Sequence, residues 1–451
     1  MRLFKLTPLV VLITQLVGVE TFAADNALSF SRSISIAQNN DPWLVGNKHQ
    51  QDSIRYLSEA SNTLPDPKMS IGFANLPTDG FDFDQEGMTQ FKVGLTQMFP
   101  RGDSLAIKNR QLREQSEAYP YQRQDRKAKV AVTVGSLWLD TYRIEESIRL
   151  IEENRALFEQ LADIAEASYS SAIGKTRQQD IVRAQLELTR LEDRLTQLAE
   201  QKNRYKGQLW RWLSEAFVNN EHYDNLNFYN LVLTKELPSI DLIESEMVAS
   251  EHWLKDEVIA QNLSAHPSVI AVEKKIQATK TGIELANQKY KPEWAVNASY
   301  GYRDDDPLGN SRSDFMSVGV TFDLPLFTED KQDNEVNSAI SKAESIKTEK
   351  ILLLRQLVGA FSGAKSRLKR IEQRQALYKN KLLPQIHDQA DASLTAYTND
   401  DGDFAEVVRS RISVLNAEID AMTIEVEKQK LHLDLNYLFA HKQIAATPKG
   451  N

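Results

Sequence analysis

Residues 92–100 read KVGLTQMFP, and residues 317–325 read SVGVTFDLP. The two phrases lie 225 positions apart, and other rigid or special residues recur at the same spacing. These pairs are Pro42 with Pro267, Pro67 with Pro292, Gly94 with Gly319, Thr96 with Thr321 and Pro100 with Pro325. A register shared over half the chain indicates an internal duplication of one large structural unit.

Each copy contains two segments in which apolar residues alternate with small or polar ones. The alternation predicts strands at about 68–76 and 89–98 in the first copy, and at about 293–303 and 313–324 in the second. Strands of roughly ten residues with aromatic side chains on one apolar face suit a tilted strand that crosses an outer membrane. A soluble hairpin is the alternative, but the long polar helices beside each hairpin offer no sheet to cover it.

Four strands in one chain are too few to close a transmembrane barrel, which needs about eight or more. The open edges of a smaller sheet would leave unpaired backbone groups in lipid, at high cost. The sequence therefore predicts a barrel that is shared between chains. Two chains would give eight strands, and three would give twelve strands and leave a lumen.

Long helices follow each hairpin. Glycine and proline are scarce, at 18 and 14 in 451 residues, which favours uninterrupted helices. We expect them at about 101–171 and 177–214 in the first copy and at about 330–397 and 404–439 in the second. A shorter helix precedes each hairpin, and an N-cap residue followed by proline marks its start. The two starts are Asp41-Pro42 and His266-Pro267.

The long helices turn back at glycine-bearing segments, SSAIGKT (170–176) and TNDDGD (398–403). Apolar residues then recur at steps of three and four, the pattern of a coiled-coil seam. The seams consist of Leu188, Leu191, Leu195 and Leu198 in the first copy, and of Ile412, Leu415, Ile419, Met422 and Val426 in the second.

The whole chain divides into five expected regions. Arg2 and Lys5, a short apolar run and small residues at Ala23 and Ala24 are typical of a secretory signal peptide at 1–23, cleaved after Ala23 or Ala24. The first repeat covers 24–215, with a short polar segment before Asp41, and the second repeat covers 266–440. Between them, residues 216–265 form an equatorial insertion, expected to pack outside the helices and to be helical from about Asp241. A C-terminal tail covers 441–451.

Composition excludes several classes of function. The net charge of −9 becomes more negative without the signal peptide, which argues against nucleic acid as a partner. The chain has no cysteine, so disulfides, thiolate metal sites and a cysteine nucleophile are ruled out. The histidines are scattered, and no nucleophile–base pair stands out. We therefore expect a non-enzyme without cofactor or metal site.

The signal peptide, the duplicated helix–β-hairpin–long-helix unit and two turn-plus-helix phrases together resemble the TolC-type outer-membrane efflux proteins. The phrases are YSSAIGKTRQQDIVRAQ (169–185) and YTNDDGDFAEVVRSR (397–411). The resemblance covers about 26–440. The segment LPDPKMSIGFANLP with the later TQMFP is similar to members that serve heavy-metal and other cation pumps.

The resemblance implies a mainly α fold with membrane β structure. By this resemblance, three protomers would form a twelve-stranded β-barrel and a periplasmic α-helical coiled-coil tunnel in the outer membrane of a Gram-negative bacterium. The homotrimer would contact outer-membrane lipid, a periplasmic adaptor (membrane fusion) protein and an inner-membrane pump of the resistance-nodulation-division type. The resemblance thus implies the passive outer-membrane channel component of a tripartite efflux system.

The same resemblance points to residues at the glycine turns. The pore constriction falls on Asp400, Asp401, Asp403 and Glu406, where carboxylates would attract cations. Arg409 stands where the family carries a second acidic residue. The adaptor-docking turn residues would be Gly174, Lys175, Thr176, Asp180, Gly402 and Arg409. A polar helix tip that is acidic only for solubility is the simpler alternative.

Two other functions stay open at the level of sequence. One is an outer-membrane exit duct for type I protein secretion, which uses the same channel family. The other is a trimeric structural or adhesin rod that uses the barrel only as an anchor, and it would place the long helices outside the cell.

Overall fold

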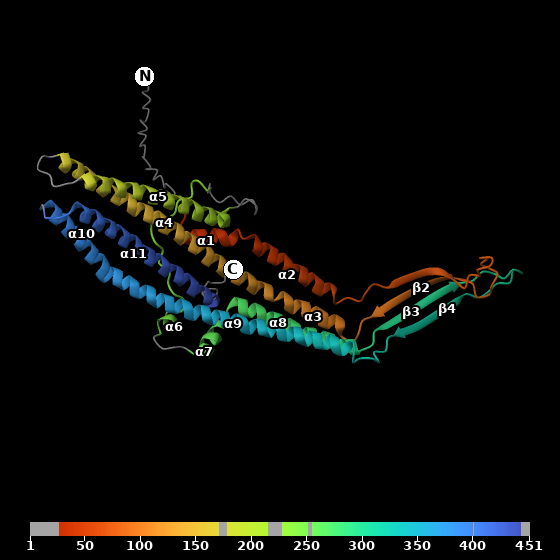
Figure 1. Ribbon diagram of the computed structural model, residues 1–451. Coiled ribbons are helices and arrows are strands. Elements are labelled where there is room, and N and C mark those ends of the chain that lie inside the picture. The colour runs from red at the N-terminus through yellow and green to blue at the C-terminus, as the bar shows by residue number, and fades with distance from the viewer. Residues whose placement is uncertain (1–26, 171–177, 215–227, 251–254, 400, 443–451) are drawn as a thin grey trace, which may run out of the picture.

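The computed structural model describes residues 27–170, 178–214, 228–250, 255–399 and 401–442. The chain is elongated (Figure 1). A small sheet lies at one end, and the long helices run from the sheet to two hairpin tips at the other end. The expected signal peptide at 1–23 and most of the C-terminal tail lie outside the described residues.

The sheet contains β1 (Lys68–Ala74), β2 (Gln90–Phe99), β3 (Trp294–Tyr302) and β4 (Phe315–Phe322). The strands are antiparallel and lie in the order β1-β2-β3-β4. The hairpins of the two copies therefore pair with each other through β2 and β3. The outer strands, β1 and β4, each keep one edge without a neighbouring strand in this sheet.

The register gives the sheet one apolar and one polar face. Ile71, Val93, Tyr300 and Met316 lie in one row across all four strands. One residue along, the row consists of small side chains on the opposite face: Ser70, Gly94, Ser299 and Ser317. The apolar row is open, since Ile71 and Met316 are 63% and 79% exposed. The strand alternation in the sequence thus produces an uncovered apolar surface.

Four helices continue the sheet as a single layer: α2 (Pro42–Ala60), α3 (Ser104–Ser116), α8 (Pro267–Asn287) and α9 (Gln332–Leu377). They pack in the order α2, α3, α8 and α9, which matches the order of the strands to which they connect. As expected from Asp-Pro and His-Pro, Asp41 and His266 cap α2 and α8, accepting hydrogen bonds from Trp43 N at 3.1 Å and Ser268 N at 3.3 Å.

The two long helices expected after the hairpins are divided, and proline explains both interruptions. The expected helix at 101–171 is two helices, α3 and α4 (Ala118–Ser170), and Pro120 removes a backbone donor next to the break. The expected helix at 330–397 consists of α9, a π-helical segment (Tyr378–Leu382) and α10 (Leu383–Thr398). Pro384 cannot donate to the preceding turn, and the wider π segment accommodates it.

The returning helices are α5 (Gln178–Leu213) and α11 (Phe404–Leu438). Helix α11 buries side chains along its whole length because α4, α9 and α10 surround it. Near the tips, residues of the predicted coiled-coil seams join one apolar core with α4. Members of this tip core are Phe158, Leu161, Leu191, Phe404, Val408, Leu415 and Ile419.

Residues before Asp41 are not only a polar segment, because they include the helix α1 (Phe30–Asn39). Ile36 and Ala37 are buried, and α1 packs against α4. Leu28 forms a bridge with Leu233 of the insertion, and its carbonyl oxygen accepts a hydrogen bond from Trp138 Nε1 at 3.0 Å. Sequence periodicity missed α1 because it has only 10 residues, although one side of it is apolar.

The described part of the insertion crosses α11 before it becomes helical. Ile240 N donates to Gln429 Oε1 at 2.9 Å, and Ile243 N donates to Asn436 Oδ1 at 2.8 Å. Its helices are α6 (Ser245–Ala249) and α7 (Asp256–Leu263), so the helix expected from about Asp241 begins later. A single 3-10 turn, Gln288–Tyr290, follows α8.

A buried polar network connects α4, α8 and α11. The Tyr437 hydroxyl donates to Asp125 Oδ1 at 2.8 Å, and His266 Nε2 lies 3.1 Å from the Tyr437 carbonyl oxygen. Burial lowers the pKa of His266, which keeps the ring neutral and leaves Nδ1 free to cap α8.

Among the described residues, no helix has both the length and the apolar character needed to cross a bilayer.

Candidate functional site

The turn between α10 and α11 forms one of the two helical tips at the end of the chain far from the sheet (Figure 1). The chain reverses tightly, since Asp401 N donates to Ala396 O at 3.0 Å. A Cβ atom at Gly402 would lie 2.6 Å from Tyr397 N, closer than real Cβ contacts allow. Glycine is therefore required here because the turn lies directly against the last turn of α10.

Asp403 has a structural role in this turn. It is the N-cap of α11, and its Oδ1 accepts a hydrogen bond from Ala405 N at 3.1 Å. A carboxylate at this position is also stabilised by the positive end of the helix dipole, as is Glu406 in the first turn. Two of the predicted constriction residues thus lie where helix chemistry alone favours an acidic side chain.

The charge of Glu406 is partly offset within the same chain. Arg409 NH1 lies 2.5 Å from Glu406 Oε2, and both side chains are exposed, at 66% and 43%. The residue that departs from the family pattern therefore forms an ion pair with the residue that matches it. The negative charge at this tip depends on Asp401 and Asp403 as much as on Glu406.

Several predicted residues lie outside the described part of the chain. These are Asp400 in the second turn and Gly174, Lys175 and Thr176 in the first. Asp180 is described: it lies in the first turn of α5, is 5% exposed and has an interaction partner. Its burial places it inside the tip, so it does not present a free carboxylate to solvent.

The helices near the tips are held together by apolar packing and by a few polar contacts. Tyr397 and Phe404 face each other across the second turn, with ring centroids 5.5 Å apart. Arg411 NH2 lies 3.0 Å from Asp391 Oδ1 and joins α11 to α10. Arg194 NH1 donates to Asn416 Oδ1 at 2.7 Å and joins α5 to α11.

Sequence reasoning did not find Arg194 or Arg411. Arg194 and its partner are separated by 222 positions, and no local pattern distinguishes either arginine from the other charged residues of these helices. Any change in the relative position of α5, α10 and α11 must break or stretch these polar contacts. Within the described residues, the histidines and carboxylates form no cluster of three that could hold a metal ion.

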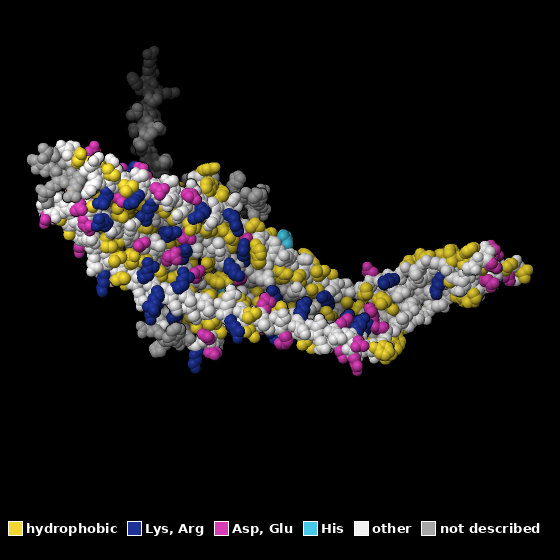
Figure 2. Space-filling model, viewed as in Figure 1, with side chains coloured by type: hydrophobic (Ala, Val, Ile, Leu, Met, Phe, Trp, Pro, Cys, Tyr) yellow, Lys and Arg dark blue, Asp and Glu magenta, His cyan; other side chains and the backbone are white. Residues whose placement is uncertain are grey.

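The charged side chains of the helical region are mixed in sign over the face seen in Figure 2. The sheet end differs, because hydrophobic side chains predominate along it and acidic ones lie toward its far loops (Figure 2). The chain therefore presents an apolar surface at one end and polar helical tips at the other.

No protein-family model matches the sequence, and no curated protein sequence matches it either. Solved structures do match over almost the full chain. The structure of CusC, described for transmembrane channel formation, has a TM-score of 0.70 and 13% identity, covering 91% of both chains. The CmeC outer membrane channel of Campylobacter jejuni has a TM-score of 0.71 and 14% identity, covering 92% of this chain and 86% of its own.

The open state of the MtrE outer membrane channel of Neisseria gonorrhoeae has a TM-score of 0.68 and 13% identity. The match covers 91% of this chain and 88% of the MtrE chain. At this level of identity the likeness concerns the path of the backbone. The chain has the fold of these outer-membrane channels.

Proposed function

We propose that this protein is the outer-membrane channel of a tripartite efflux system, and that it conducts substrates passively as a homotrimer. The observation that carries the proposal is the incomplete sheet, in which an apolar face is exposed and the outer strands β1 and β4 each lack a neighbour on one side. The layer of α2, α3, α8 and α9 is open in the same way.

Three copies related by a threefold axis would close both the open sheet and the open helix layer. Pairing β4 of one copy with β1 of the next would give twelve strands and remove every edge. Lipid would then cover the apolar face that includes Ile71, Val93 and Met316. The helices α9 and α2 follow the same order, so they would meet between copies and extend the barrel as a tube.

The helical tips are the proposed docking site for a periplasmic adaptor protein, which would connect the channel to an inner-membrane pump of the resistance-nodulation-division type. Their distance from the sheet supports this arrangement, because tips on the periplasmic side of a membrane-embedded sheet would lie deep in the periplasm. The lateral contacts of Arg194 and Arg411 would have to rearrange when the tips part, which makes them candidates for controlling the opening.

Purified protein reconstituted in planar bilayers should form stable trimers and give discrete, passive conductance steps. Cross-linking in detergent measures the stoichiometry, and single-channel recording measures the conductance. Protease treatment of intact cells should cut the loop at 303–313 and spare the turn at 398–403. Monomers that pass no ions would contradict the proposed channel, and cleavage of the turn with protection of the loop would support a rod that points outward.

Cation selectivity is expected to respond in opposite directions to two changes at the tip. Asp403→Asn with Glu406→Gln removes two carboxylates per protomer, while asparagine still caps α11, so the preference for cations should fall. Arg409→Gln releases Glu406 from its ion pair, so the preference should rise, by roughly twofold for an exposed pair. Reversal potentials in a KCl gradient measure both changes.

Arg190→Gln is the matched control, because Arg190 forms an ion pair with Glu187 at the same three-residue spacing on α5, farther from the turn. It should leave the reversal potential unchanged. If the Asp403/Glu406 and Arg409 variants also behave like the starting protein, the carboxylates at this tip do not select ions, and the acidic tip serves only helix capping and solubility.

A further inference from the structure

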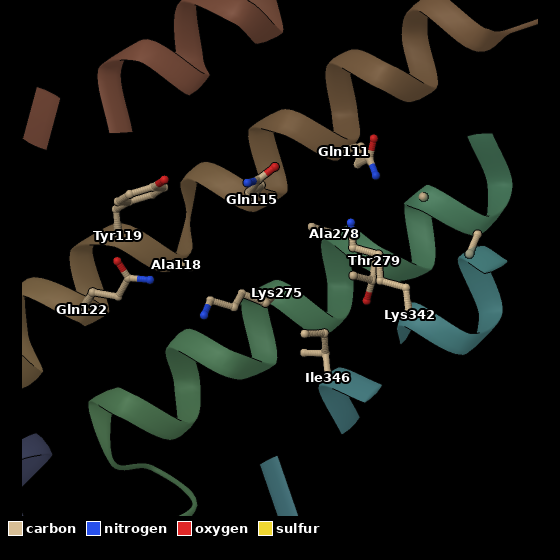
Figure 3. Close-up of a pocket in the computed structure, with 12 residues that line it drawn as sticks. Gln111, Gln115, Ala118, Tyr119, Gln122, Lys275, Ala278, Thr279, Lys342 and Ile346 are labelled. Carbon is tan, nitrogen blue, oxygen red and sulfur yellow. The ribbon is translucent and has the colours of Figure 1, made fainter. Parts of the chain in front are cut away.

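A cavity of about 370 Å³ lies where α3, the start of α4, α8 and α9 meet. Figure 3 shows glutamine side chains on α3 and α4 on one side of it and the lysine side chains on the opposite side. Its polar lining consists of Gln111, Gln115, Tyr119, Gln122, Lys275, Thr279 and Lys342. The volume is in the range of small-molecule sites in proteins.

Among the described residues no carboxylate forms an ion pair with Lys275 or Lys342, and three acidic side chains on or beside α3 and α8 have other partners. Glu117 lies 2.6 Å from Lys274 Nζ, Glu114 accepts from the Thr281 hydroxyl at 2.5 Å, and Glu273 pairs with Lys350. Within the described chain, neither lysine forms an ion pair. Both ammonium groups are therefore available to bind an anionic group.

The remaining wall of the cavity is apolar. Ala118, Ala278, Ala339 and Ile346 contribute to it. Gly282 keeps the space open, because a Cβ atom there would lie 2.7 Å from Gln111 Nε2 and displace that amide. A ligand that fits must therefore combine a small apolar body with a group that accepts hydrogen bonds from ammonium and amide donors.

We propose that this cavity binds a small amphipathic organic anion, of the class of single-ring carboxylates. The carboxylate lies between Lys275 and Lys342 and accepts further hydrogen bonds from the glutamine amides. Charge-assisted bonds of this kind are stronger than neutral ones. The ring packs on the alanine and isoleucine side chains, where its burial adds a hydrophobic contribution.

The position of the cavity relates it to the proposed channel. Gln122 and Trp138 are sixteen residues apart on α4, so at about 100° per residue they lie about 160° apart around the helix. Trp138 faces Leu28 and α1, which places the cavity on the opposite side of α4. If α1 and the insertion cover the outside of the trimer, the cavity faces the passage, and that placement rests on the proposed function.

Binding can be measured on the detergent-solubilised full-length protein with salicylate as the probe, by equilibrium dialysis. Salicylate should bind saturably, and the neutral analogue salicylamide should bind at least about tenfold more weakly, because it lacks the charge. Lys275→Gln with Lys342→Gln should reduce salicylate affinity by a similar factor and make it insensitive to salt. Gly282→Leu, which fills the cavity, should abolish binding.

Lys347→Gln is the control: Lys347 is an exposed lysine on α9, paired with Glu344 and outside the cavity, and its loss should not change the affinity. The proposal would be overturned if salicylate does not bind saturably, or if the double lysine variant binds it as tightly as the unmodified protein does. Equal binding of salicylamide and salicylate would overturn it as well. Binding does not require conduction. Loss of salicylate binding with intact channels would therefore disprove only the cavity, and silent channels that bind salicylate would disprove only the channel.

Discussion

Replacing Arg126 with alanine is expected to lower the free energy of unfolding by about 3 kcal/mol. Arg126 Nε lies 2.6 Å from Asp41 Oδ2, and the Asp41 side chain is only 3% exposed. Removing one partner of a buried ion pair leaves the other charge desolvated, which costs about 3–5 kcal/mol. The lower end applies because the arginine is 32% exposed. Denaturant unfolding followed by tryptophan fluorescence measures the change.

Arg126 also holds three helices together. Its guanidinium group lies 5.6 Å from the Trp43 ring centroid on α2 and 5.4 Å from the Trp212 ring centroid on α5. Arg126→Lys keeps the charge but loses the planar fork and the stacking, so we expect an intermediate loss. Arg126→Ala combined with Asp41→Asn should lower the free energy of unfolding by less than the sum of the two single losses. If Arg126→Ala lowers the free energy of unfolding by less than about 0.5 kcal/mol, the buried Asp41 carboxylate does not depend on Arg126 for its stability.

Gly402→Ala is expected to destabilise the tip of the second hairpin by about 2 kcal/mol, within the range for overpacked sites. The added methyl group would lie 2.6 Å from Tyr397 N and 2.8 Å from Ala396 C, and both are backbone atoms that cannot move aside alone. Amide hydrogen exchange at the start of α11 should become faster, and in bilayers the channel should spend more time open.

Gly359→Ala provides the matched comparison. Gly359 lies within α9, and an added Cβ atom there meets nothing within 4 Å. Alanine in an exposed helix interior is more favourable than glycine by about 0.8–1.0 kcal/mol, so this variant should be slightly stabilised. Unchanged hydrogen exchange in Gly402→Ala would mean that the turn relaxes without strain, and the close approach would then not control the tip.

Much of the fold could be predicted because its signals are local. The alternation in KVGLTQMFP and SVGVTFDLP, read with the 225-residue spacing, predicts a duplicated hairpin with one apolar face. Asp41 and Asp403 cap helices with contacts two residues away, so their roles depend only on their immediate neighbours. The divided helices were harder to predict, because a proline indicates a break in a helix but not whether the helix bends, ends or forms a π segment.

Of the two candidate sites, one could be predicted from the sequence and the other could not. The acidic second turn was visible in TNDDGD, and the pairing of Glu406 with Arg409 spans only three residues. The cavity at Lys275 and Lys342 was not visible, because it depends on which neighbouring acids already have partners. Lys274 and Lys275 are adjacent in sequence, yet only the first pairs with Glu117, which lies 157 positions away.

The sequence by itself determined the strands, the cap residues and the glycine turns, since each depends on backbone preferences within a few residues. Only the tertiary structure decided that β2 lies beside β3, that Arg126 joins Asp41 to two tryptophans and that two lysines lie unpaired in one cavity. Those features depend on the path of the chain between distant segments. That path is set by the combined packing of many side chains, which no short stretch of sequence contains.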